Sequence, residues 1–127
     1  MIVVDASAAV AALLNAGPAR QALSDETLHA PHLIDSEVAQ VLQRLVLRGS
    51  LGAGDGWAAL DTWRRLGVVR HSVGGLLDRV WELRENVSAY DASYLALAEA
   101  LDCSLLTADA RLGRAPDLRC PVTVVPR

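Results

Sequence analysis

Short runs of apolar, mostly β-branched residues recur along the chain, and helix-forming segments separate them. Runs of this kind, each about four residues long, are typical of strands buried on both faces in a parallel sheet covered by helices. Five runs fit this description: residues 1–4, 27–30, 68–71, 104–107 and 122–125. Such strands, alternating with helices, predict a layered α/β fold with a mainly parallel sheet.

The clearest helical pattern repeats apolar residues on one face of a 3.6-residue turn. Its members are Ile34, Val38, Val41, Leu42 and Leu45, with Gly49 closing the helix. Further helices are expected over 6–14, 19–24, 76–84, 89–101 and 109–114, and around Trp57, Leu60 and Trp63. The glycine-rich stretch 51–56 predicts a flexible joint, and Pro31 predicts the end of the second strand. The sequence has no repeat, linker or low-complexity tail, so a single domain over 1–127 is expected.

Composition excludes several classes of function. The apolar fraction of 52% excludes a disordered chain, and the net charge of −3 argues against a broad basic surface for nucleic acid. All 12 basic residues are Arg, which excludes Schiff-base chemistry, a P-loop lysine and a lysine general base. Phe is absent, so an RNA-binding sheet that stacks bases on aromatic side chains is a poor fit.

Two further features indicate a protein of the reducing cytoplasm. Cys103 and Cys120 form no CxxC pair and no cluster with His, so two free thiols are expected in place of a zinc site. The uncharged stretch 6–18 is too short to cross a bilayer and follows no basic segment. A membrane-spanning or secreted protein is therefore not expected.

Acidic residues stand where ligands of such folds bind, at the carboxyl ends of the strands. Asp5 follows the first strand and Asp109 the fourth, while Glu37 and Asp91 fall in the first turns of two helices. Each has an ordinary explanation taken singly. Asp5 suits a helix N-cap, Asp91 suits a capping box with Ser88, and Glu37 suits a solvated helix flank.

Together the four acids indicate a metal site. Packed carboxylates repel each other and raise one another's pKa unless a cation neutralises them. Hard oxygen ligands suit Mg²⁺ or Mn²⁺, and no His or Cys stands nearby to favour a softer metal. Such a site supports hydrolysis of phosphodiesters by a metal-activated water.

Four ordered motifs resemble the PIN-domain ribonucleases, specifically the VapC toxins of bacterial toxin–antitoxin pairs. The matching pieces are VVDASA at 3–8, IDSEV at 34–38, YDASYLALA at 90–98 and LLTADARL at 105–112. The resemblance covers the whole chain. It implies a three-layer α/β/α sandwich with a five-stranded parallel sheet in the order 3-2-1-4-5.

The resemblance also implies roles for individual residues. Asp5, Glu37, Asp91 and Asp109 match the acidic quartet that binds Mg²⁺ or Mn²⁺. Ser7 and Thr107 match hydroxyl positions beside it, where they would orient a carboxylate or a metal ligand. Asp35 lies near the site and is expected to be a helix N-cap. The implied activity is a metal-dependent endoribonuclease that leaves a 5′-phosphate and a 3′-hydroxyl, with no covalent intermediate.

The implied partners are an RNA substrate, a second copy in a homodimer, and a VapB-type antitoxin whose tail reaches the acidic site. Four apolar residues could line a groove for that tail or belong to the core: Leu47, Leu51, Trp57 and Trp63. Four arginines could guide phosphate or simply be solvated: Arg44, Arg48, Arg64 and Arg65. His29, His32 and His71 are expected to be structural.

Two phosphoryl-transfer classes with acids at strand ends fit less well. Receiver domains need a late lysine, which this chain lacks, and haloacid-dehalogenase-type phosphatases need an acid where Ser7 stands. Two alternatives remain open at the level of sequence. One is a non-catalytic α/β interaction domain whose acids are all helix caps, and the other is a PIN domain that acts chiefly as a scaffold.

Overall fold

A five-stranded sheet forms the centre of the computed structural model, which describes all 127 residues. The strands are β1 (Ile2–Val4), β2 (Leu28–Pro31), β3 (Val69–His71), β4 (Ser104–Thr107) and β5 (Val122–Val124). All neighbouring strands are parallel, and their order is β3-β2-β1-β4-β5. The predicted parallel sheet and its strand order are confirmed.

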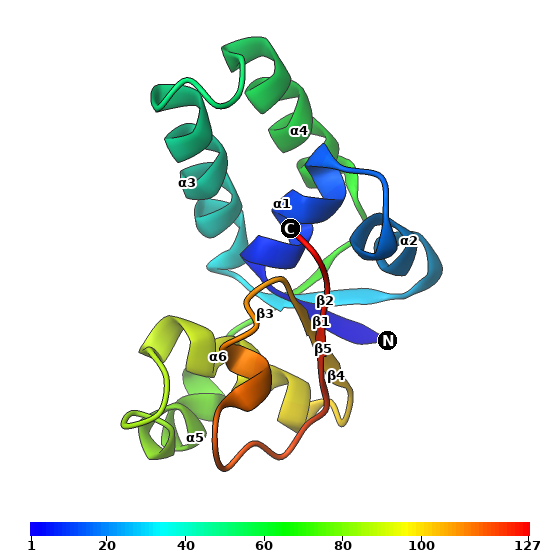
Figure 1. Ribbon diagram of the computed structural model, residues 1–127. Coiled ribbons are helices and arrows are strands. Elements are labelled where there is room, and N and C mark those ends of the chain that lie inside the picture. Colours follow the sequence, from blue (N-terminus) through cyan, green and yellow to red (C-terminus); the bar gives the residue numbers. More distant parts are fainter.

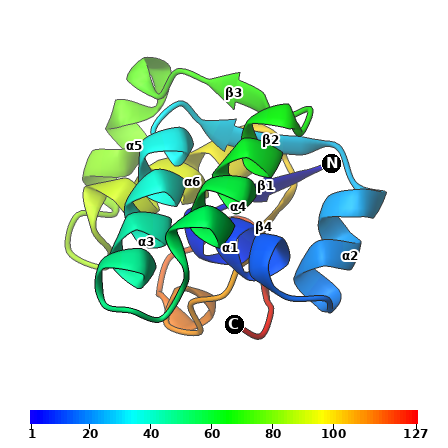
Figure 2. The same ribbon diagram turned by 90° about the horizontal axis from the view of Figure 1, so that it is seen from above.

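Helices cover both faces of the sheet and complete the predicted three layers (Figure 1). One layer holds α1 (Ala6–Leu14), α2 (Pro18–Asp25), α3 (Ile34–Leu47) and α4 (Ala53–Arg65). The other holds α5 (Leu77–Glu82) and α6 (Ala89–Ala100), preceded by a 3₁₀ turn at Gly74–Leu76. Figure 2 looks down on the first layer, with α3 and α4 in front of α1. None of these helices is both long and apolar enough to cross a membrane.

The alanine-rich α1 is the helix on which the first layer is built. Its residues Ala8 and Ala9 are fully buried, and it contacts α2, α3, α4 and β4. A helix that is apolar on all sides must be covered on all sides, and small side chains allow the close approach that this requires. On the opposite face, α6 is buried continuously from Ala92 to Ala98 and packs on β1, β2 and β4.

The second strand ends at Pro31, as predicted: Pro31 is the last residue of β2, paired with His71, and at a strand end its missing N–H interrupts no inner part of the ladder. Two other local predictions were wrong. The expected flexible joint over 51–56 is shorter, because α4 already begins at Ala53. The expected helix over 109–114 is only a 3₁₀ turn at Leu112–Arg114, because Asp109 bonds to the backbone N–H of Arg111 in a local turn.

Gly56 allows α4 to lie close to α3. A Cβ atom added at Gly56 would stand 2.8 Å from Cγ2 of Val46, whereas one added at Gly54 would meet nothing within 4 Å. Val46 is β-branched and has little freedom to rotate away. Gly56 therefore sets the spacing of the α3–α4 hairpin, and Gly54 does not.

We expect opposite effects of alanine at these two glycines. Gly54→Ala should stabilise the protein by about 0.5 to 1 kcal/mol through helix propensity alone. Gly56→Ala should lower stability by about 1 to 2 kcal/mol, because overpacking against Val46 outweighs the same gain. Urea denaturation of the two variants beside the parent tests this, and equal stabilisation by both would contradict the close approach.

Candidate active site

Asp5 is the most buried acid of the protein, with 5% of its surface exposed at the carboxyl end of β1. Its carboxylate accepts hydrogen bonds from Ser7 Oγ at 2.6 Å, from the backbone N–H of Ala8 at 3.0 Å, and from the Thr107 hydroxyl. The bond from Ala8 caps α1, as expected. Burial raises the pKa of Asp5, although the three hydrogen bonds lower it. The fold therefore holds this carboxylate rigidly where water cannot fully solvate it.

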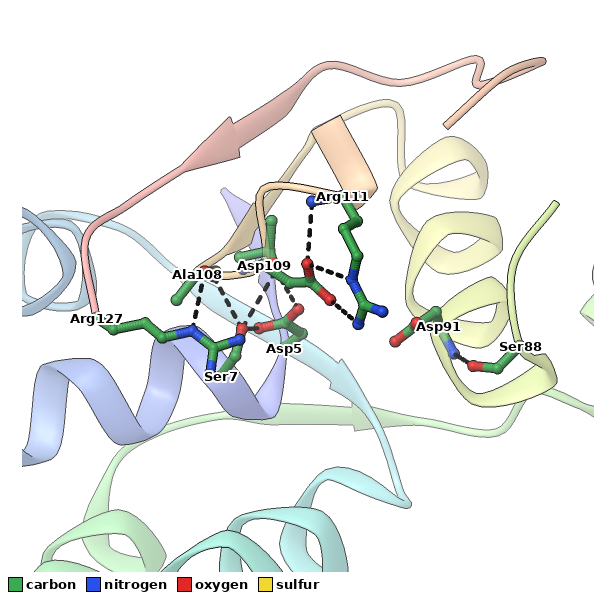
Figure 3. Close-up of polar contacts among 9 residues, drawn as sticks. Asp5, Ser7, Ser88, Asp91, Ala108, Asp109, Arg111 and Arg127 are labelled. Atoms are coloured by element: carbon green, nitrogen blue, oxygen red, sulfur yellow. Dashed lines mark hydrogen bonds and ion pairs between the residues drawn. The ribbon is translucent and has the colours of Figure 1, made fainter. Parts of the chain in front are cut away.

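Ser7 and Thr107 tie the start of α1 to the end of β4 around Asp5. Their hydroxyl oxygens lie 3.2 Å apart. Ser7 Oγ accepts the backbone N–H of Ala108 at 2.8 Å, and Thr107 Oγ1 accepts that of Asp109 at 3.0 Å. Both hydroxyls are thus engaged in fixing Asp5 and the turn that carries Asp109 (Figure 3).

Glu37 lies in the first turn of α3 and is half-buried. Its Oε1 accepts a hydrogen bond from the hydroxyl of Tyr94, a residue of α6 that is 2% exposed. The pKa of Glu37 is raised, chiefly by burial and also by the charges of Asp91 and Asp5. Burial and the bond to Glu37 raise the pKa of Tyr94 above its ordinary value, so Tyr94 stays a donor.

Asp91 is an acid of the quartet whose carboxylate forms no ion pair. Ser88 caps α6 by accepting the backbone N–H of Asp91 at 3.1 Å, but the reciprocal bond expected for a capping box is absent. The Ser88 hydroxyl is the one protein donor near the carboxylate of Asp91. The pKa of Asp91 is raised by burial and then by the charges of Asp5 and Asp109. A helix cap therefore does not explain the carboxylate of Asp91.

Asp109 is neutralised by an arginine two residues along the chain. Arg111 donates from Nε to Oδ1 at 3.1 Å and from Nη2 to Oδ2 at 2.8 Å. This pair holds the pKa of Asp109 below its ordinary value. Figure 3 shows the Arg111 guanidinium between the carboxylates of Asp109 and Asp91. Asp109 is thus the one member of the expected quartet that forms an ion pair with a cationic side chain.

The four acids share one edge of the sheet, and each lies near enough to another to affect its pKa. As they stand, no three His, Cys, Asp or Glu side chains of the protein are gathered closely enough to hold one metal ion. The donor set is nevertheless carboxylate oxygen throughout, which is the chemistry that Mg²⁺ and Mn²⁺ select. Burial disfavours the negative charges of Asp5, Glu37 and Asp91, and a divalent cation would offset that cost.

One expectation about a neighbouring residue was wrong, and one open choice is decided. Asp35 is not an N-cap, because α3 begins one residue earlier, at Ile34; its carboxylate instead binds Arg70 at 2.6 and 2.8 Å and Trp63 Nε1 at 2.9 Å. Of the two readings of Trp63, core is confirmed, because this side chain is 1% exposed. Trp57 and Leu47, in contrast, are 58% and 78% exposed.

Other predictions near the sheet are confirmed or made more specific. Cys103 and Cys120 are free thiols, and burial raises the pKa of Cys120 to about 11. His29 on β2 and His71 on β3 contact each other, with Nδ1 and Nε2 2.9 Å apart. Both histidines lie outside the acidic edge, and none of the three histidines contacts a quartet member.

A family model described as the PIN domain matches residues 2–118. The chain belongs to the PIN-domain family. Within it, the chain belongs with the VapC ribonucleases: it is 64% identical to "Ribonuclease VapC9" of Mycobacterium tuberculosis over 127 residues, which is 100% of both chains. It is also 43% identical to "Ribonuclease VapC1" of the same organism over 128 residues, covering 97% of this chain and 96% of the relative.

Solved structures agree on the fold of this PIN domain. A protein of Pyrobaculum aerophilum matches with a TM-score of 0.71 at 23% identity, over 95% of this chain and 81% of that one. VapBC2 of Rickettsia felis, solved with a DNA fragment of its promoter, matches with a TM-score of 0.67 at 17% identity, over 97% and 99% of the two chains. At these identities the likeness concerns the fold alone.

Two residues of this VapC-type site were not singled out from the sequence. Tyr94 lies three positions after Asp91, so both project from the same side of α6, a spacing that could have marked it. Arg111 stands two positions after Asp109 in the last motif, but its reach back to that carboxylate depends on the turn that replaces the expected helix. Both contact a member of the quartet.

The raised pKa of Asp5 predicts how stability depends on pH. A carboxyl whose folded pKa is raised stabilises the fold while protonated and loses that contribution as pH rises through the raised pKa. In metal-free buffer, Asp5→Asn should therefore melt above the parent at pH 7, and the difference should shrink as pH falls toward 4. Asp109→Asn should not melt above the parent at pH 7, because the lowered pKa of Asp109 means that its ionised form stabilises the fold. Melting curves from pH 4 to 7 test both, and a pH-independent difference for Asp5→Asn would contradict the assignment.

Proposed function

We propose that this VapC-type PIN domain is an endoribonuclease that hydrolyses RNA phosphodiester bonds as the toxin of a VapBC-type pair. The observation that carries the proposal is the acidic edge itself, where burial raises the pKa values of Asp5, Glu37 and Asp91 and the charges of neighbouring acids raise them further. The 64% identity to "Ribonuclease VapC9" over the full length supports the same activity. We take residues 1–127 to act as one catalytic unit in the reducing cytoplasm.

The cofactor of this reaction is a divalent ion, Mg²⁺ or Mn²⁺, held by Asp5, Glu37, Asp91 and Asp109. When bound, the ion lowers the pKa of the attacking water and stabilises the charge that develops on the phosphate. Asp5 is preorganised for this role by three hydrogen bonds. The Asp91 carboxylate forms no ion pair, and Asp109 would hold the ion beside or in place of Arg111.

Neighbouring side chains position the acids for the reaction. Ser7 and Thr107 hold both oxygens of Asp5, and Tyr94 holds one oxygen of Glu37, so these three are positioning residues. By donating to the carboxylates, their hydroxyls favour the ionised form and offset part of the effect of burial. Arg111, once released from Asp109, is free to neutralise phosphate oxygens, for which a guanidinium is well suited.

The partners of this toxin are its RNA, a VapB-type antitoxin and a second copy of the chain. An apolar groove of about 250 Å³ lies between α3 and α4, with Leu42, Leu47, Trp57 and Leu60 among its lining. Exposed Trp57 and Leu47 suit a segment of antitoxin there. Leu77 and Trp81, 55% and 68% exposed on α5, give a second apolar surface for a homodimer, which sedimentation velocity can test.

We expect Asp5→Asn and Asp91→Asn each to reduce RNA cleavage by at least 100-fold in Mg²⁺ or Mn²⁺, with the fold retained. Each removes a charged ligand from a site that depends on charge. Asp78→Asn is the matched control, because Asp78 stands in the first turn of another helix and is exposed. Cleavage is followed on a panel of RNAs, including transfer and ribosomal RNA, with and without chelator.

The outcome separates this function from the non-catalytic alternative. Cleavage that survives chelator or Asp5→Asn would exclude the proposed site. If no RNA of the panel is cut, calorimetric titration with Mn²⁺ decides, since helix caps would bind no divalent ion tightly and the quartet should.

For the antitoxin, we expect Trp57→Arg to weaken co-purification with a VapB-type antitoxin at least tenfold while leaving RNA cleavage unchanged. A charged side chain in the apolar groove must be desolvated for the antitoxin to bind. Trp81→Arg, at an equally exposed tryptophan on the other layer, should leave the complex intact. If only Trp81→Arg dissociated the complex, the antitoxin would be assigned to the surface of α5 instead.

A further inference from the structure

We propose that a second site, the cleft between α1 and α3, binds the RNA strand beside the phosphate that is cut, with Arg44, Arg48 and Arg127 as its phosphate ligands. This inference rests on the proposed nuclease function and adds to it the residues that hold the substrate.

The cleft has the size and lining of a nucleotide site. Its volume is about 440 Å³, and ten residues line it, among them three arginines and no Asp or Glu. Val10 and Leu14 of α1 form one apolar wall, and Val41 and Leu45 of α3 form the other. A pocket with apolar walls and a few placed charges is the usual form of a small-ligand site. Here the charges are all positive.

None of these three arginines forms an ion pair with an acid. Arg44 has no hydrogen-bond or ion-pair partner, Arg48 donates only to Ser50 Oγ, and Arg127 donates only to the Ala108 carbonyl at 3.4 Å. Of the other nine arginines, Arg20, Arg84 and Arg114 also have no acidic partner, and six pair with acids: Arg64, Arg65, Arg70, Arg79, Arg111 and Arg119. In a chain of net charge −3, three unpaired cations around one cleft form a strong local contrast.

The structure also separates the four arginines that the sequence had grouped as possible phosphate guides. Arg64 and Arg65 both pair with Asp61 on α4, at 2.7 and 2.9 Å. Arg44 and Arg48 are one turn apart on the face of α3 that looks into the cleft. Only Arg44 and Arg48 are placed to bind an RNA strand in the cleft.

The cleft opens directly onto the acidic edge. Ser7, which donates to Asp5, also lines the cleft. Figure 3 shows Arg127 beside Ser7 and Asp5, with its Nε directed to the carbonyl of Ala108. A strand whose scissile phosphate lies at the acids would therefore place a neighbouring nucleotide against Arg127 and the cleft.

The chemistry favours RNA over a peptide as the occupant. Three guanidinium groups with no acid between them match the repeated negative charge of a phosphodiester backbone, and Arg binds phosphate through two parallel hydrogen bonds. The apolar walls suit a base or ribose, whereas an antitoxin segment has the more apolar groove between α3 and α4 available. Repeated charge also makes the site testable by salt.

The test uses a fluorescein-labelled single-stranded RNA of about 12 nucleotides, with anisotropy measured in an Asp5→Asn background that does not cleave. Arg44→Gln, Arg48→Gln and Arg127→Gln together should weaken binding at least tenfold. The slope of log affinity against log salt should fall by about 0.7 for each phosphate that the variant no longer neutralises. The matched control, Arg64→Gln, Arg65→Gln and Arg114→Gln together, makes the same change in net charge and should bind within twofold of the parent. Replacing the three cleft arginines with Lys should restore part of the affinity.

Three results would overturn the inference. The cleft and control variants could be weakened equally, which would indicate a general charge effect. The cleft variant could bind RNA like the parent while failing to bind a VapB-type antitoxin, which would make the cleft a protein-docking site. The Asp5→Asn protein could fail to bind the RNA at all. RNA cleavage by the parent is measured separately, so the nuclease function can stand while the cleft assignment fails. Melting temperatures of both triple variants establish that each is folded.

Discussion

The buried carboxylate of Asp5 is the group on which the rest of the site depends. It terminates β1, caps α1, and accepts a hydrogen bond from Thr107 at the end of β4. Ser7 closes the same network by bonding both Asp5 and the backbone of Ala108. Two strands and a helix are thus locked at the sheet edge by one charge that burial leaves poorly solvated. Such a network is stable only while every donor is satisfied, and no buried side-chain polar atom of the protein lacks a partner.

Negatively and positively charged side chains occupy two adjoining parts of one surface. The acids gather where the strands end, and Arg111 forms an ion pair with Asp109 and a charge interaction with Asp91. On the other side of Ser7 the cleft between α1 and α3 carries arginines with no acid beside them. The proposed cation site beside the proposed phosphate-binding cleft is a coherent arrangement for a polyanionic substrate. The net charge of −3 conceals this division, because net charge reports no positions.

Much of the fold follows from patterns within single segments. The bounds of α1 and β4 were predicted to the residue, because an alanine-rich run and a short apolar run each specify their own structure. The errors fell at the start of α4 and after Asp109, where a close helix approach or a side-chain bond to the backbone decides the outcome. Those are tertiary or turn effects that local propensity does not contain.

The sequence by itself determined the α/β class, the parallel sheet, the positions of the four acids at strand ends and first helical turns, and the family. Periodicity and motif order are written in adjacent residues, so no long-range contact is needed to detect them. Only the tertiary structure decided that Asp91 forms no ion pair, that Arg111 turns back to Asp109, and that Tyr94 holds Glu37. It also decided that Arg44 and Arg48 face a cleft while Arg64 and Arg65 pair with Asp61. The physical reason is the same in each case. An ionisable side chain takes its partner from whatever the packed fold brings within hydrogen-bond distance, and that distance is set by segments far apart in the chain.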